Sequence, residues 1–279
     1  MRSILVTVDD TPSSVAARGL AVDLARQTGA KIRGVTAVEV SDLDRVELAP
    51  VGGVEYAYAS LQHRKKLAAE RRARIAELPA SFRHAVAEAG LEAPCSMIEA
   101  DIRNGLLREM EACDLVVTGR DTEFHLESVE GLTPLVEHLV ARGSRPVVVT
   151  GAAAVGSGPV LVAYDGSAPA AKALQMAVLL GMFGSSGAHI LSVCRDRADA
   201  SAMATRAREF LKVHGVEADL DAQGSSGDPA GILLKRAEKV GARMLVMGAF
   251  GHRGFREILF GSCTRHLFTS APLPLFIYH

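Results

Sequence analysis

The chain repeats itself, and this repeat constrains its fold more than any other feature. Residues 4–10 match residues 160–166: each segment is an apolar run that ends in an acid and precedes a turn of small residues with proline. Later in each half, residues 114–119 match residues 243–248 in the same way. Self-similarity of this kind indicates two copies of one structural unit.

The repeat also sets the expected domain boundaries. We predict a first unit at residues 1–150 and a second at 159–279, joined by a linker of small, uncharged residues at 151–158. The matching segments are offset by 156 residues at the first strand and by 129 at the fourth. The first half therefore carries about 27 additional residues (156 − 129), most of them between its second and third strands.

Each unit has the pattern of an α/β fold. Its strands are continuous apolar runs rather than alternating ones, which indicates a parallel sheet covered by helices on both faces. The fold class we expect is therefore two tandem doubly wound five-stranded parallel sheets, each a three-layer sandwich. The second half gives this order: strand 159–164, helix 168–183, strand 188–194, helix 197–214, strand 216–222, helix 228–240, strand 243–248, helix 262–270 and strand 273–278.

Composition excludes several classes of protein. The net charge of −1 provides no field that would attract nucleic acid, and no apolar run is long enough to cross a membrane. The N-terminus lacks a signal-peptide pattern, and the cysteines form no CxxC pair, so we expect a cytoplasmic protein with reduced thiols. These cysteines are Cys95, Cys113, Cys194 and Cys263.

The most specific motif lies near the C-terminus. Gly248 and Gly251 are followed by Gly261 and Ser262, so the pattern is glycine, two residues, glycine, nine residues, glycine-serine. It begins at the end of an apolar strand and ends at the start of a helix. Glycines let main-chain N–H groups approach an anion, and the first turn of a helix offers unpaired donors. The motif therefore predicts a site for the phosphates of a nucleotide.

This spaced motif, together with the repeat, resembles the ATP-binding branch of the universal stress protein family over essentially the whole chain. The resemblance implies the adenine-nucleotide α-hydrolase-like form of the flavodoxin-like sandwich. It implies ATP as the ligand, with or without Mg²⁺, held at the carboxyl ends of the strands in the second half. It also implies that the two halves pair within the chain through residues 147–149 and 275–277, with a homodimer of chains as a further option.

The same resemblance assigns roles to individual residues of the second half. Asp165 would contact adenine or ribose, and Val193 would offer main-chain groups to the edge of the adenine. The remaining positions would lie beneath or around the phosphates: Met247, Gly248, Gly251, His252, Arg253, Gly254, Gly261, Ser262, Cys263 and Thr264. One departure is Ala163-Tyr164 before Asp165, where the family frequently has proline.

The first half departs from the motif much further. Thr122 occupies the second glycine position, and Leu132 stands where serine is needed. Carboxylates lie where phosphates would bind, and like charges repel. They belong to Asp121, Glu123, Glu127 and Glu130. We therefore predict that only the second half binds a nucleotide.

Other signals have simpler interpretations. Asp9 is expected to be a turn or capping residue, whereas Asp165 is expected to contact ligand; for His252, ligand contact and a solvated loop position are equally favoured. The basic run at 63–74 is expected on the solvated face of a helix at 56–77. Pro79, which follows this helix, is expected to end or kink it. No His/Cys spacing predicts a metal site.

The function we predict is a nucleotide-binding regulatory or stress-protective protein rather than an efficient enzyme. The chain has no GxxxxGK[ST], GxGxxG or GxSxG motif at the positions that those folds require. Two alternatives stay open. One is slow ATP hydrolysis or phosphotransfer with His252 or Asp165 as the candidate base, and the other is an assembly module that binds no ligand. AMP or another ligand in place of ATP also stays open.

Overall fold

The structure, a computed structural model, describes the whole chain except residues 38–53, 100, 123, 125–133, 153–155 and 250–261. The first half contains β1 (Ser3–Thr7), α1 (Pro12–Thr28), β2 (Lys31–Ala37), α3 (Val54–Ala87), β3 (Cys95–Ile98), α4 (Ile102–Glu111), β4 (Leu115–Gly119), α5 (Pro134–Arg142) and β5 (Val147–Thr150). The second half contains β6 (Val160–Ala163), α6 (Ala168–Leu179), a 3-10 turn (Gly184–Ser186), β7 (Ala188–Cys194), α7 (Arg197–Val213), β8 (Ala218–Gly224), α8 (Pro229–Val240), β9 (Met244–Gly248), α9 (Ser262–Ser270) and β10 (Leu275–Tyr278).

The predicted α/β fold class is confirmed, and the strands of both halves form one ten-stranded sheet in the order β3-β2-β1-β4-β5-β10-β9-β6-β7-β8. All neighbouring strands are parallel except β5 and β10, which pair antiparallel at the centre. The register joins three residues of each strand: Leu275 with Val149, Phe276 with Val148 and Ile277 with Val147. The predicted pairing of the halves through their last strands is therefore confirmed, while the domain boundaries stay a prediction.

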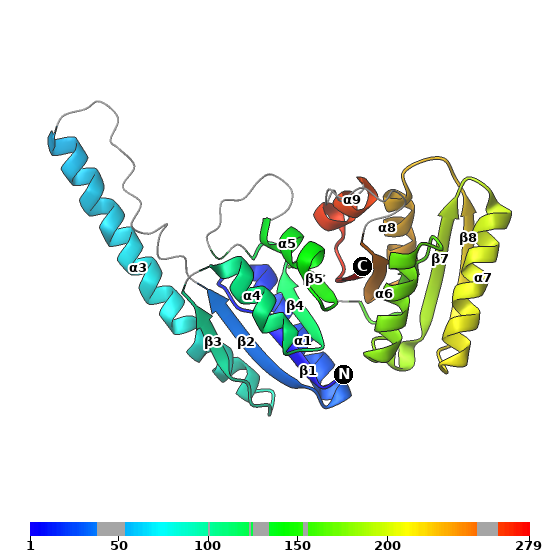
Figure 1. Cartoon of the computed structure of the whole chain (residues 1–279), viewed down its shortest axis with the longest axis horizontal. Helices are drawn as coiled ribbons and strands as arrows, with labels where there is room; N and C mark the ends of the chain where they lie inside the picture. The colour runs from blue at the N-terminus through cyan, green and yellow to red at the C-terminus, as the bar shows by residue number, and fades with distance from the viewer. Residues whose placement is uncertain (38–53, 100, 123, 125–133, 153–155, 250–261) are drawn as a thin grey trace.

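The helices cover both faces of the sheet (Figure 1). One buried apolar cluster joins the sheet to α1, α3, α6 and α7, and a second joins its other face to α4, α5, α8 and α9. Central strands such as β4 are buried along their whole length. Continuous apolar runs are thus needed because each strand contributes side chains to both clusters.

Capping residues fix where the helices begin. Thr11 accepts a hydrogen bond from the main-chain N–H of Ser14 at the start of α1, and Ser167 accepts one from Ala170 at the start of α6. Each cap is followed by proline in the first helical turn, where the missing N–H costs nothing. The repeated turns identified in the sequence are therefore two equivalent helix starts.

Helix α3 accounts for much of the additional length of the first half, between β2 and β3 as predicted. It has 34 residues, a length of about 50 Å at 1.5 Å per residue. Of the two outcomes predicted for Pro79, an end or a kink of the helix, the end is wrong, because α3 continues through Pro79 to Ala87. The turns after Pro79 are held by tertiary packing, since Phe82 and Val86 are fully buried against the sheet. This packing outweighs the hydrogen bond that proline removes.

Candidate functional site

A pocket opens at the carboxyl ends of β6, β7 and β9, where α6 and α9 begin. Its volume is about 370 Å³, within the range of roughly 300–1,000 Å³ that is typical of small-molecule sites. Strands β7 and β9 flank β6, so the pocket lies at the point where the strand order of the second half reverses. Ligands of doubly wound sheets bind at such points.

Seven of the predicted site residues line this pocket: Asp165, Val193, Met247, Gly248, Ser262, Cys263 and Thr264. The other five lie outside the described residues: Gly251, His252, Arg253, Gly254 and Gly261. The pocket also has walls that the sequence analysis did not identify: Tyr164, Ser167, Cys194, Met203, Pro229 and Leu233. These residues lie outside the spaced glycine motif and come together only through the fold.

Gly248 allows the end of β9 to approach the first turn of α6. A Cβ atom at this position would lie 2.5 Å from the main-chain nitrogen of Ala170 and 2.6 Å from the carbonyl carbon of Pro169. Real Cβ atoms do not come so close to other atoms. The glycine is therefore required by packing at the floor of the pocket, whether or not a ligand is present.

Asp165 is exposed at the rim of the pocket and also shapes the turn before α6. Its Oδ1 accepts a hydrogen bond of 3.0 Å from the main-chain N–H of Ser167. Gly166 between them has a φ of 75°, a left-handed conformation that favours glycine. This hydrogen bond in the turn and contact with a ligand are compatible because a carboxylate has a second oxygen that can accept further hydrogen bonds.

The first turn of α9 brings main-chain donors and hydroxyl groups to the pocket. Ser262 is exposed, Cys263 is half-buried and Thr264 is buried. Burial, with smaller effects from Asp228 and Asp165, raises the pKa of the Cys263 thiol to about 11. The thiol is therefore protonated at neutral pH, and it adds no negative charge beside the helix N-terminus.

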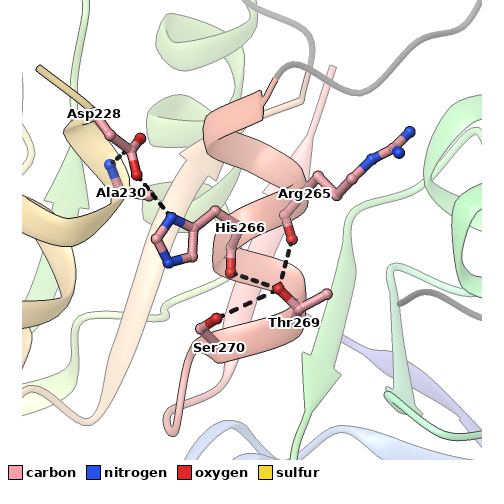
Figure 2. Close-up of polar contacts among 6 residues, drawn as sticks. All are labelled: Asp228, Ala230, Arg265, His266, Thr269 and Ser270. Carbon is pink, nitrogen blue, oxygen red and sulfur yellow. Dashed lines mark hydrogen bonds and ion pairs between the residues drawn. The ribbon is translucent and has the colours of Figure 1, made fainter. Parts of the chain in front are cut away.

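An unexpected polar contact links α8 and α9 beside this turn (Figure 2). Asp228 caps α8, with 3.1 Å between Oδ1 and the main-chain nitrogen of Ala230, and its Oδ2 lies 2.7 Å from Nδ1 of His266. The hydrogen bond from Ala230, assisted by His266, holds the pKa of Asp228 below its usual value. The Asp228-Pro229 sequence was the available signal, because aspartate before proline is typical of a helix start.

The equivalent place in the first half has different surroundings. Phe124, from the segment that corresponds to the glycine-rich loop, is 3% exposed and packs in the same apolar cluster as Val35 and Ala37. By repeat position, these two residues correspond to the pocket residues Leu191 and Val193. Phe124 adopts a left-handed φ of 44° to reach this position. An aromatic ring of this loop is thus buried in the apolar cluster of the first half.

Asp9 is a residue of the turn before α1, the role expected from the sequence. Its Oδ1 accepts hydrogen bonds from the main-chain N–H and the hydroxyl of Thr11, at 2.9 and 2.6 Å. Next to it, Asp10 forms an ion pair with Arg74 of α3. Of the residues in the corresponding loop, Asp121 and Thr122 are described, whereas Glu123, Glu127, Glu130 and Leu132 are not.

No group of three or more His, Cys, Asp or Glu side chains in the described part of the chain is placed to hold a metal ion. No helix in the described segments combines the length and the apolar character needed to span a membrane.

Comparisons with known proteins agree with the resemblance seen in the sequence. The model of the Universal stress protein family matches residues 157–279. "Universal stress protein Slr1230" of Synechocystis is 22% identical over 290 residues, covering 100% of both chains. A crystal structure of a universal stress protein from Archaeoglobus fulgidus has a TM-score of 0.70 at 20% identity, covering 99% of this chain and 97% of the other. A structure from Pseudomonas aeruginosa UCBPP-PA14 has a TM-score of 0.58 at 16% identity, covering 100% and 93%. The second half of the chain thus matches the Universal stress protein family, and over its full length the chain is similar to a universal stress protein.

Proposed function

We propose that the second half binds an adenine nucleotide and that the bound nucleotide serves a regulatory, stress-related role. The observation that carries this proposal is the pocket at the reversal of strand order, which ends at the first turn of α9. The universal stress protein family supports the stress-related part of the role. The ligand we propose is ATP, with or without Mg²⁺, with AMP as the alternative.

The phosphates are proposed to bind at α9. The first N–H groups of a helix have no partners within it, and the helix dipole favours negative charge at this end. Ser262 and Thr264 add hydroxyl donors, and the protonated Cys263 thiol adds no repulsive charge. These features match the chemistry of a polyphosphate.

The base and the ribose are proposed to lie deeper along the strand ends. Val193, Met247 and Leu233 give the pocket apolar walls that suit a purine ring. Strands β6 and β7 pair only as far as Ala163 and Leu191, so the main chain near Val193 borders the pocket. Asp165 at the rim has an oxygen that can accept a hydrogen bond from a ribose hydroxyl.

A single site per chain is proposed because the corresponding places in the two halves differ. In the first half, Phe124 of the corresponding loop is buried in the apolar cluster, and Asp121 adds a carboxylate to the loop. A triphosphate there would face like charge rather than free donors. Slow hydrolysis in the second half stays an alternative, with Asp165 as the described candidate base.

The proposal is tested by changing Ser262, the exposed first residue of α9. Ser262→Asp places a carboxylate where the phosphates would bind, yet an acid in the first turn of a helix is stabilising by about 0.3–1 kcal/mol. Calorimetric titration should show ATP affinity reduced by at least about tenfold, a change of 1.4 kcal/mol. Affinity for adenosine, which has no phosphates, should be unchanged.

Ser262→Ala is the matched control, because it removes one hydroxyl and adds no charge; it should weaken ATP binding only a few-fold. Thermal unfolding of both variants checks that the fold is intact. ATP affinity that is the same in Ser262→Asp and the wild-type protein would refute the phosphate assignment, and a wild-type protein that binds neither ATP nor AMP would refute the proposed function.

A further inference from the structure

The side chain of Arg120, in the first half of the chain, contacts the second half. It follows β4 directly, and its guanidinium donates hydrogen bonds to two main-chain carbonyls at the end of α9. The distance from Nη1 to the carbonyl oxygen of Thr269 is 3.2 Å, and Nη2 donates to the carbonyl oxygen of Ala271. The partners are 149 and 151 residues away along the sequence.

The helix that Arg120 contacts is the one that supplies the proposed phosphate donors. Helix α9 has only nine residues, and helices shorter than about 12 residues are marginal on their own. Its position therefore depends on tertiary contacts. Two of its side chains, Leu267 and Phe268, are fully buried. A third, His266, lies within hydrogen-bond distance of Asp228, and Arg120 donates hydrogen bonds to the carbonyls at its C-terminal end.

The charge of Arg120 also suits this place. The C-terminal end of a helix carries partial negative charge, and a cation there is favourable. Burial lowers the pKa of the Arg120 guanidinium, but an arginine side chain stays charged in proteins. The dipole of α9 would therefore stabilise both a cation at its C-terminal end and an anion at its N-terminal end.

The repeat shows that this contact is asymmetric. The main-chain N–H of Arg120 donates to the carbonyl of Thr150 at 2.7 Å, and the N–H of Ala249 donates to the carbonyl of Tyr278 at 2.9 Å. The two residues thus occupy equivalent places at the ends of β4 and β9. The half that departs from the nucleotide motif supplies a guanidinium, and the half that keeps the motif has only a methyl group there.

We propose that Arg120 is a positioning residue for the nucleotide site of the other half. It fixes the end of α9 and so holds the first turn, Ser262 to Thr264, at the pocket. The first half thereby contributes to phosphate binding without binding a nucleotide itself. This inference rests on the proposed function. It predicts that loss of Arg120 weakens binding of the phosphates and leaves binding of adenine and ribose unchanged.

The test compares ATP and adenosine binding by calorimetry in the full-length chain. Arg120→Met keeps the apolar stem but removes the donors, and we expect ATP affinity to fall about tenfold, in the range of typical coupling between sites. Adenosine affinity should not change. Arg120→Lys retains a cation and a donor at the same place and should recover part of the loss.

Arg145→Met is the matched control. Arg145 donates to the carbonyl of Glu111 at the end of α4, at 3.1 Å, and both residues belong to the first half. This variant should bind ATP like the wild-type protein. If Arg120→Met does not fold, the comparison of ATP with adenosine in Arg120→Lys decides the matter, since a smaller but selective loss of ATP affinity is still expected.

The inference is overturned if Arg120→Met binds ATP as tightly as the wild-type protein. It is also overturned if ATP and adenosine affinities fall equally, because a general loosening of the fold would do that. A wild-type protein that binds no nucleotide would refute the proposed function as well, and this outcome is distinguishable from the first two.

Discussion

Gly248→Ala tests whether the floor of the pocket is as tightly packed as the structure indicates. The new methyl group would lie 2.5 Å from the main-chain nitrogen of Ala170 and 2.9 Å from Cβ of Pro169. Both neighbours belong to the first turn of α6, which is held by its cap and cannot rotate away as a flexible side chain would. Overpacking of this kind costs about 1–3 kcal/mol. We expect the free energy of unfolding to fall by this amount and nucleotide affinity to fall with it.

The matched control is Gly19→Ala, in the exposed middle of α1. Apart from the neighbouring residues and the backbone of α1 itself, no atom lies within 4 Å of a Cβ placed there, so the substitution adds helix propensity without a clash. It should raise the free energy of unfolding by about 0.5–1 kcal/mol. Urea unfolding measures both variants. If Gly248→Ala is as stable as the wild-type protein, or if both alanine variants change stability in the same direction, the packing argument is refuted.

Two further predictions concern buried side chains away from the pocket. Phe124→Ala should lower the free energy of unfolding by about 3–5 kcal/mol in urea titrations, because a fully packed ring is lost; a loss under 1 kcal/mol would contradict its place in the core. Burial, with Arg236 nearby, lowers the pKa of His189 in the folded protein. The unfolded chain, with a histidine pKa of about 6.5, then binds more protons, so stability should be retained above pH 6.5 and decrease as the pH falls below it. His189→Gln should reduce this loss between pH 7.5 and 5.5, and an unchanged loss would rule out His189 as a contributor.

Much of the fold could be predicted from local pattern. Continuous apolar runs located β6, β7, β9 and β10 of the second half, whereas β8 is an edge strand of mixed polarity. The largest boundary difference is at α6, predicted to reach residue 183 and observed to end at Leu179. Gly181, in a left-handed conformation, follows that end. Repeats and apolar periodicity depend on burial that recurs along the chain, so the sequence itself reveals them.

The contacts that local sequence patterns did not predict are made by single side chains between residues far apart in the sequence. His266 and Asp228 are 38 residues apart, and neither lies in the glycine motif. Helix α3 continues through Pro79 because of packing by residues that follow the proline, which a local rule does not include. Arg120 could have been noticed as a charged residue where the other half has alanine, but its partner could be known only from the fold.

The central strand pair suggests why a half without a nucleotide motif is retained. Strand β10 has β9 on one side and β5 on the other, and Phe276 and Val148 at the junction are fully buried. Without β5, the second half would expose an unpaired strand edge whose side chains are apolar, and such edges promote association of chains. Covering this edge requires only the strands and helices of the first half and places no demand on its β4–α5 loop. That loop can therefore carry Thr122 where the second half has glycine and can bury Phe124, while Arg120 beside it makes the contact with α9.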